Sequence, residues 1–168
     1  MKNWSHWVYW SLGLLFFQSF VLSQIQVYGY LNPYVYLLVI LLVPASASRI
    51  SLLVIGALVG GFMDFQMLSG GMHLMASTLL AYLRPFLLDF IVPRASEENL
   101  GFTRQEVGWQ KWVIYTLLGT FIHHFYLFAV DAHGLYNPLG FLWRSFLSAM
   151  ATVVLMLIMG ILMKPSAP

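Results

Sequence analysis

Residues 50–91 read ISLLVIGALVGGFMDFQMLSGGMHLMASTLLAYLRPFLLDFI, which is two apolar stretches on either side of a short turn. This arrangement predicts a hairpin of two helices, at about 50–64 and 72–91. On the first helix, Gly56, Gly60 and Asp64 recur every fourth residue and therefore share one face. Small residues at this spacing let another helix approach closely inside a membrane, so the face is expected to pack against a neighbour.

The second helix of the hairpin carries a stripe that begins and ends in an ionisable group. His73, Ser77, Leu80 and Arg84 are spaced by four, three and four residues, which puts them on one face. An arginine at the centre of a membrane helix costs about 2.5 to 3.5 kcal/mol on insertion scales. Arg84 is therefore expected to face protein, water or the interface.

The turn between the two helices, from Phe65 to Gly71, brings Asp64 and His73 within reach of each other. We expect a hydrogen bond between them that pins the hairpin, because polar groups near helix ends commonly serve this way. The alternative is a contact with a ligand, a proton or a partner, since intramembrane ionisable groups are candidates for function.

The composition is that of a membrane domain. Of the 168 residues, 60% are hydrophobic and 8% are charged, whereas soluble domains carry about 25% charged residues. Only the connector 93–111 combines length with charge, so we expect one polytopic domain over residues 1–168. Lysine and arginine are scattered singly, which disfavours nucleic-acid binding. The absence of cysteine excludes disulfides, thiolate metal sites and a cysteine nucleophile.

The apolar runs predict an all-α integral membrane protein whose helices form a compact bundle. Pro44 and the small residues after it divide the run 34–64 into two pieces of about 14 residues, which span about 21 Å and fall short of a hydrocarbon core of about 30 Å. They either cross a thinned bilayer or form a re-entrant hairpin, in which Arg49 lies deeper and needs a partner. We read the first apolar run as an anchor and not a cleaved signal. The six expected helices are 7–22, 34–46, 50–64, 72–91, 111–130 and 138–163.

The basic residues predict an orientation. With the N-terminus in the cytoplasm, all but one of them lie on or toward that side, as the positive-inside rule requires. We therefore expect both termini in the cytoplasm. The residues on that side are Lys2, Arg49, Arg84, Arg94, Arg104, Lys111 and Lys164, and the exception is Arg144.

The last two predicted helices add polar groups without a catalytic motif. A zinc site among the histidines would lack a spacing such as H-E-x-x-H. Arg144 could meet Asp131 or a lipid phosphate. No Gly-x-Ser-x-Gly elbow, pair of intramembrane aspartates or phosphate-binding glycine loop occurs, so we expect neither an enzyme nor a cofactor. A small, polar face on the last helix suits core packing or a homodimer contact; its members are Ser145, Ser148, Ala149 and Thr152.

The runs GALVGGFMD (56–64), SGGMH (69–73) and LRPF (83–86) closely resemble the rod shape-determining protein MreD family. The preceding PASASR (44–49) is similar to that family's segment before the glycine-rich helix. Length, helix count and short loops agree over nearly the whole chain. We assign to the hairpin, as candidate partner-binding or packing residues, Arg49, Gly56, Gly60, Asp64, Gly71, His73, Ser77, Arg84 and Pro85.

The resemblance implies a non-enzymatic scaffold of cell-wall elongation in the bacterial inner membrane. Such a protein would bind MreC and work beside RodA, its transpeptidase partner and the MreB filament. The hairpin would be rigid, and an exposed apolar groove beside its glycines would accept a partner's transmembrane helix.

The family also looks similar in fold to the substrate-binding subunits of energy-coupling-factor vitamin transporters. A small-molecule (vitamin-like) binding subunit of a transporter is therefore the alternative function. It would need a central cavity lined by polar groups from several helices. The candidates for that lining are Ser77, Thr116, Thr120 and His123.

Overall fold

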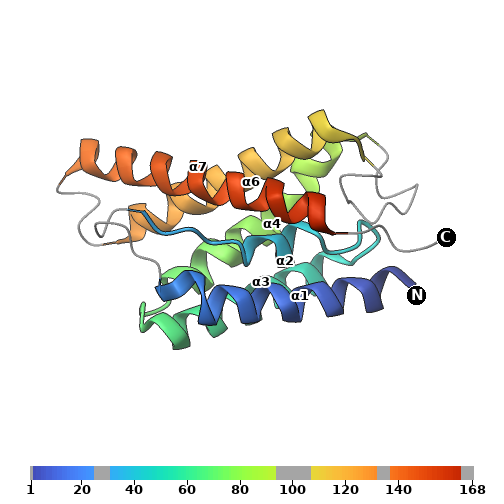
Figure 1. Cartoon of the computed structure of the whole chain (residues 1–168), viewed down its shortest axis with the longest axis horizontal. Coiled ribbons are helices and arrows are strands. Elements are labelled where there is room, and N and C mark those ends of the chain that lie inside the picture. The colour runs from blue at the N-terminus through green and yellow to red at the C-terminus, as the bar shows by residue number, and fades with distance from the viewer. Residues whose placement is uncertain (1, 25–30, 94–106, 132–136, 164–168) are drawn as a thin grey trace.

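The computed structural model describes residues 2–24, 31–93, 107–131 and 137–163, and within these ranges the chain is helical apart from short connections. Figure 1 shows long helices running roughly along one axis. The elements are α1 (Lys2–Phe20), the 3-10 turn η1 (Leu22–Gln24), α2 (Leu37–Leu41), α3 (Arg49–Met67), α4 (Met72–Ile91), α6 (Trp109–Val130) and α7 (Pro138–Leu162).

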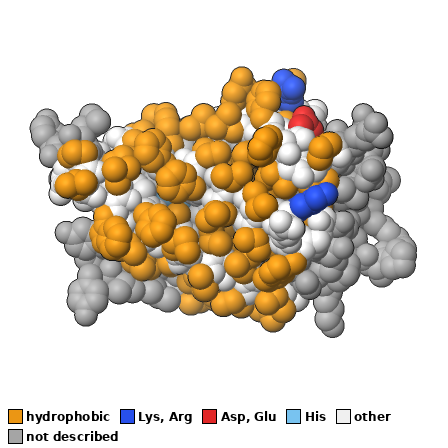
Figure 2. Space-filling model, turned by 90° about the horizontal axis from the view of Figure 1, so that it is seen from above, with side chains coloured by type: hydrophobic (Ala, Val, Ile, Leu, Met, Phe, Trp, Pro, Cys, Tyr) orange, Lys and Arg blue, Asp and Glu red, His pale blue; other side chains and the backbone are white. Residues whose placement is uncertain are grey.

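Four helices, α3, α4, α6 and α7, are long and apolar enough to cross a membrane. Their outward side chains are hydrophobic, such as Leu58 on α3, Phe90 on α4 and Ile158 on α7. Figure 2 shows one face of the molecule covered mostly by hydrophobic side chains, with the charged ones in view toward one end. A surface of this kind suits lipid and not water. The chain is thus an all-helical membrane protein.

The helices alternate in direction. The start of α1 and the end of α7 lie at one end of the molecule, together with the start of α3 and the end of α4, whereas the turn between α3 and α4 lies at the opposite end (Figure 1). We call these the terminal end and the turn end. α3 packs against α4, α4 against α6, and α6 against α7. The starts of α1, α3 and α6, which contain Lys2, Arg49 and Lys111, lie toward the terminal end (Figure 1), and Arg94, Arg104 and Lys164 fall outside the described residues.

The predicted helix over 34–46 is wrong. Only Leu37–Leu41 is α-helical there, and the chain on both sides of it is irregular. Every residue from Tyr34 to Val43 is buried. This stretch, which we call the buried crossing (residues 31–43), runs through the interior from the turn end toward the terminal end (Figure 1). It neither forms a full helix nor faces lipid.

The burial explains why an irregular backbone is possible at this depth. Lipid offers no hydrogen bonds, so non-helical backbone survives within a membrane only where protein or a water-filled cavity surrounds it. Pro33 lies near the start of the crossing and Pro44 directly follows it, and both lack an N–H that a helix would need to pair. Several N–H groups of the crossing bond to its own carbonyls, such as Leu38 to Val35 at 3.0 Å and Val39 to Tyr36 at 2.9 Å. The backbone groups that these turns leave over need partners from the helices around the crossing.

The α3–α4 contact is as close as the glycines predicted. A Cβ built on Gly60 would lie 2.5 Å from the carbonyl oxygen of His73 and 2.6 Å from Cα of Leu74. A Cβ on Gly56 would lie 2.7 Å from Cβ of Ala81. The prediction of a packing face is confirmed, and the face that packs is filled by α4 itself.

Candidate functional site: the buried crossing and its polar shell

A glutamine from α1 forms hydrogen bonds with the backbone in the first half of the buried crossing. The Gln18 side chain is fully buried, and its amide nitrogen donates to the carbonyl of Pro33 at 3.2 Å. Its amide oxygen accepts from the backbone N–H of Tyr36 at 3.4 Å. One side-chain amide thus takes the place that a neighbouring strand or helical turn would fill.

Two hydroxyls from α7 serve the same half of the crossing. The backbone N–H of Asn32 donates to Oγ of Ser148 at 3.2 Å, and that of Tyr34 donates to Oγ1 of Thr152 at 3.0 Å. Ser148 and Thr152 belong to the small, polar face predicted on this helix. Core packing therefore uses that face, which removes these two hydroxyls from a homodimer contact.

Arg84 serves the second half of the crossing, where α2 ends. Its Nε donates to the carbonyl of Leu41 at 3.3 Å, and its Nη2 donates to the carbonyl of Val43. The hydroxyl of Tyr115 donates to the same Leu41 carbonyl at 2.9 Å. The end of a helix leaves carbonyls without partners, and a cation there also suits the helix dipole. The prediction that Arg84 faces protein is confirmed, since it is 1% exposed.

The centre of the crossing is a hydrogen-bonded cluster around the Tyr36 hydroxyl. This oxygen lies 2.9 Å from Nδ1 of His73, 2.9 Å from Nε2 of His123 and 3.3 Å from Oγ of Ser77. A phenol has a single proton, so at most one of these imidazoles receives it and the other must donate an N–H. His123 and Ser77 are fully buried, and His73 is 2% exposed.

One buried nitrogen of His123 indicates which ring nitrogens of His73 and His123 carry a proton. Nδ1 of His123 is buried and has no partner within the described residues. Buried acceptors without partners occur more often in proteins than buried donors without partners. We therefore assign the proton of His123 to Nε2, from which it donates to Tyr36, while the Tyr36 hydroxyl donates to Nδ1 of His73.

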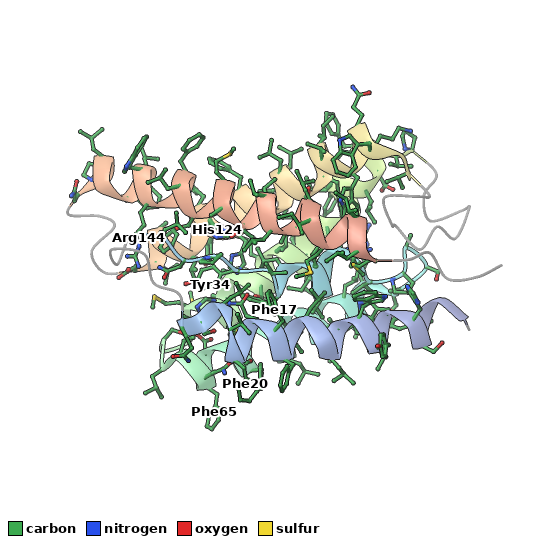
Figure 3. All side chains as sticks on the ribbon, viewed as in Figure 1. Phe17, Phe20, Tyr34, Phe65, His124 and Arg144 are labelled. Atoms are coloured by element: carbon green, nitrogen blue, oxygen red, sulfur yellow. The ribbon has the colours of Figure 1, made fainter. Side chains whose placement is uncertain are left out.

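A third histidine, His124, connects α6 to α7 beside this cluster. Its Nδ1 donates to the carbonyl of Thr120 at 2.9 Å, and its Nε2 lies 3.2 Å from the Thr152 hydroxyl. The Tyr34 ring packs between His73 and His124, with ring centroids 4.9 and 5.3 Å away. Figure 3 shows Tyr34 and His124 in the interior, between α7 and α1. Within the described ranges no group of three or more His, Asp or Glu side chains is placed to hold a metal ion.

Asp64 joins the two helices of the hairpin as predicted, but it bonds to backbone N–H groups and not to the His73 imidazole. Its carboxylate accepts from the backbone N–H of His73 at 3.0 Å, from that of Leu74 at 2.8 Å, and from the Ser69 hydroxyl. It therefore caps the start of α4, where N–H groups lack partners. The His73 imidazole is not its partner, because that ring turns inward to Tyr36.

The other hairpin residues have structural roles or lie at the terminal end. Gly71 precedes α4 with a φ of 96°, a conformation that favours glycine. Pro85 lies inside α4, which continues through it. Arg49 is exposed at the start of α3, with its guanidinium carbon 5.6 Å from the centre of the Phe86 ring. Arg49 therefore lies at the end of its helix and outside the protein interior.

A small polar cavity opens at the turn end, above the histidines. It has a volume of about 140 Å³. Arg144 and Asp131 lie at its wall and form an ion pair at 3.0 Å, so the predicted Asp131 contact of Arg144 is confirmed. The cavity is also lined by Asn32, Tyr34, Ser69 and His73.

An apolar groove of about 200 Å³ lies between α1 and α3 on the outer surface. Its single polar side chain is Ser11, whose hydroxyl is buried and has no partner within the described residues. Because α4 covers the glycines of α3, the predicted groove beside those glycines is wrong, and this one lies on another side of α3. Its walls are Val8, Leu12 and Leu15 from α1, and Ile55, Leu58 and Val59 from α3.

The sequence carried a signal for some of the residues that it did not single out. Gln18 stands among the apolar residues of the first helix, and a lone amide inside a membrane span requires a polar partner. Tyr36 and Tyr115 gave no such signal, because tyrosines in this chain also suit the membrane interfaces.

A scan of the chain against models of protein families, a search of curated proteins and a search of solved structures each found no match.

Proposed function

We propose that this chain is a non-enzymatic membrane scaffold of bacterial cell-wall elongation, of the MreD type. It would lie in the inner membrane with both termini in the cytoplasm and bind MreC, alongside RodA, its transpeptidase partner and the MreB filament. The positions that carry the resemblance support this proposal. Gly56, Gly60 and Asp64 join α3 to α4, and His73 and Arg84 hold the buried crossing.

The observation that carries the proposal is that the polar side chains of the interior form hydrogen bonds within the protein itself. Its histidines, tyrosines, glutamine and arginine bond to the chain's own backbone and to one another. Such a network specifies one rigid arrangement. A rigid body with apolar outer faces is suited to holding other membrane helices in place, which is what a scaffold does.

We propose the groove between α1 and α3 as the surface for a partner's transmembrane helix. Its walls are apolar, and Leu58 is 68% exposed beside it. Without a hydrophobic driving force in lipid, helix association depends on close packing and on interhelical hydrogen bonds. The small Ser11 side chain, which lines the groove, allows an incoming helix to approach α1 closely.

Co-purification from native membranes in a gentle detergent, with identification by mass spectrometry, tests this function. The wild-type chain should recover MreC and other elongation proteins. A bulky change in the groove, Leu58→Trp, should reduce that recovery at least tenfold. The matched control is Ile158→Trp on α7, which replaces another exposed aliphatic residue outside the groove and should leave recovery unchanged. Equal recovery with both variants would reject the groove, and absence of elongation proteins from the wild-type sample would reject the scaffold.

A transporter subunit that binds a small molecule is the second candidate. Interrupted helices mark substrate sites in many transporters, and the buried crossing is interrupted in this way. However, the turn-end cavity is about 140 Å³, whereas pockets for drug-sized ligands have about 300 to 1,000 Å³. Of the predicted lining residues, Thr116 and Thr120 bond within the protein, to the Trp112 carbonyl and to Met156. Recovery of an ATPase and a coupling subunit in the same experiment would favour this candidate.

A further inference from the structure

A cavity at the terminal end brings two arginines together. It has a volume of about 200 Å³ and lies between α3, α4 and the connector that joins the buried crossing to α3. Arg49, Arg84 and Asp89 line it, with Ala45 and Ala47 from the connector. The ionised groups on its wall therefore sum to one positive charge. The scaffold function proposed above makes no use of this cavity.

Arg84 is a buried cation that forms no ion pair with a described residue. Two of its five N–H groups donate to the carbonyls of Leu41 and Val43. These carbonyls are dipoles, so they satisfy donors without neutralising the charge. In the part of the chain that the structure describes, the one ion pair joins Arg144 to Asp131, far from this end. An uncompensated charge in a protein interior is costly, and a bound ion is one way to offset that cost.

The rest of the cavity also favours an anion. Arg49 is the first residue of α3, and the N–H groups of a helix's first turn carry a partial positive charge. Its guanidinium lies against the Phe86 ring, which keeps it on the α4 side near the cavity. Asp89 is exposed and forms no ion pair with a described residue, so it opposes an anion without neutralising either arginine.

The position of the cavity indicates which anion reaches it. The neighbouring side chains Ile50, Phe86 and Phe90 are 75%, 50% and 80% exposed, and they belong to the lipid-facing surface. The cavity thus opens where apolar surface meets the ends of the helices, which is the depth of phospholipid headgroups. We propose that it binds the phosphate of an anionic phospholipid, with Arg49 and Arg84 as the charged ligands. Inorganic phosphate offers the same chemistry without the acyl chains.

Native mass spectrometry of the full chain in a neutral detergent, with added phosphatidylglycerol, tests the proposal. The wild-type protein should retain one lipid at low lipid concentration. Arg49→Gln should weaken retention about tenfold, the loss expected for one hydrogen bond to a charged group. Asp89→Asn should strengthen retention, because it removes the opposing carboxylate. Lys111→Gln is the control, since it removes one positive charge that does not line the cavity.

Thermal unfolding with phosphatidylglycerol or with inorganic phosphate identifies the source of the phosphate. A rise in Tm with the lipid alone assigns the site to membrane lipid, and a rise with both assigns recognition to the phosphate group itself. The proposal is overturned if neither raises the Tm, or if Arg49→Gln and Lys111→Gln retain phosphatidylglycerol equally. In that case another carboxylate, from this chain or from a partner, is the counter-ion of Arg84. Because Arg49 is exposed, its replacement tests the site without disturbing the interior.

Discussion

The buried crossing and the α3–α4 hairpin both lie away from water, but their backbone N–H and C=O groups find hydrogen-bond partners in different ways. The hairpin satisfies its backbone within each helix and brings the helices together through Gly56 and Gly60. The crossing has little regular structure, so its backbone depends on side chains such as Gln18 and Arg84. The hairpin therefore tolerates no added volume at its contact, and the crossing tolerates no loss of a polar partner. Each can be broken by a change that the other would survive.

The largest expected effect is that of adding one methyl group to the hairpin contact. Gly60→Ala would place a carbon 2.5 Å from the His73 carbonyl oxygen, where only backbone can move aside. We expect a loss of about 3 kcal/mol in the free energy of unfolding, at the upper end for overpacking. Chemical unfolding in detergent measures it.

The matched control for Gly60 is its neighbour in the sequence. A Cβ on Gly61 would lie 3.6 Å from a methyl of Leu74, an ordinary contact. Gly61→Ala should be neutral or stabilise by about 0.5 kcal/mol through helix propensity. If Gly60→Ala is as stable as Gly61→Ala, α3 and α4 do not pack through this face.

The next largest effect is expected when a polar partner of the crossing is removed. Gln18→Leu would leave the Pro33 carbonyl and the Tyr36 N–H buried without partners. We expect a loss of about 2 kcal/mol, because each of the two unsatisfied groups costs at least about 1 kcal/mol. The same unfolding experiment measures it, with Gln110→Leu as the control, since the Gln110 side chain is exposed at the start of α6 and its replacement should cost less than about 1 kcal/mol. A neutral Gln18→Leu would show that the crossing does not depend on side chains.

A smaller effect is expected at the centre of the crossing. Tyr36→Phe keeps the ring and removes the hydroxyl that joins His73 to His123. The cost should be about 1 to 2 kcal/mol, as for a buried polar group left unpaired. Nitrogen-15 NMR of the histidines should show both imidazoles changing their tautomer populations. Tyr82→Phe, on the exposed surface of α4, should change neither stability nor the spectrum.

The smallest effect on stability is expected at the turn. Asp64→Ala removes a helix cap, which costs about 1 kcal/mol. If the hairpin acts in assembly, this variant should nevertheless reduce co-purification of elongation proteins more than stability-neutral changes in the connector 93–111. Normal recovery of partners with Asp64→Ala would argue against a role of the hairpin in assembly.

The sequence predicted the α3–α4 hairpin well, because regular helices follow from patterns of nearby residues. The hairpin boundaries 50–64 and 72–91 lie within a few residues of α3 and α4, and the polar stripe from His73 to Arg84 is buried as a unit. The spacing of Gly56 and Gly60 predicted their contact correctly. These features depend on residues three or four positions apart in the chain.

The buried crossing could not be predicted in the same way. The run 34–46 is apolar enough for a helix, and its departure from helix depends on partners up to 118 residues away, such as Thr152 for Tyr34. The polar cluster has the same character, since Tyr36, His73 and His123 come from three segments. Single-sequence patterns hold no information on such pairings.

The most direct test of the account asks whether residues 34–43 are shielded from lipid. A phospholipid with a photoreactive diazirine in its acyl chain, activated in reconstituted vesicles, labels the protein surface that lipid touches, and mass spectrometry locates the labels. We expect labels on exposed residues such as Leu12, Leu58 and Ile158, and none between Tyr34 and Val43. Labelling of 34–43 to the same extent as Leu58 would show a lipid-facing helix there, and would contradict the buried crossing.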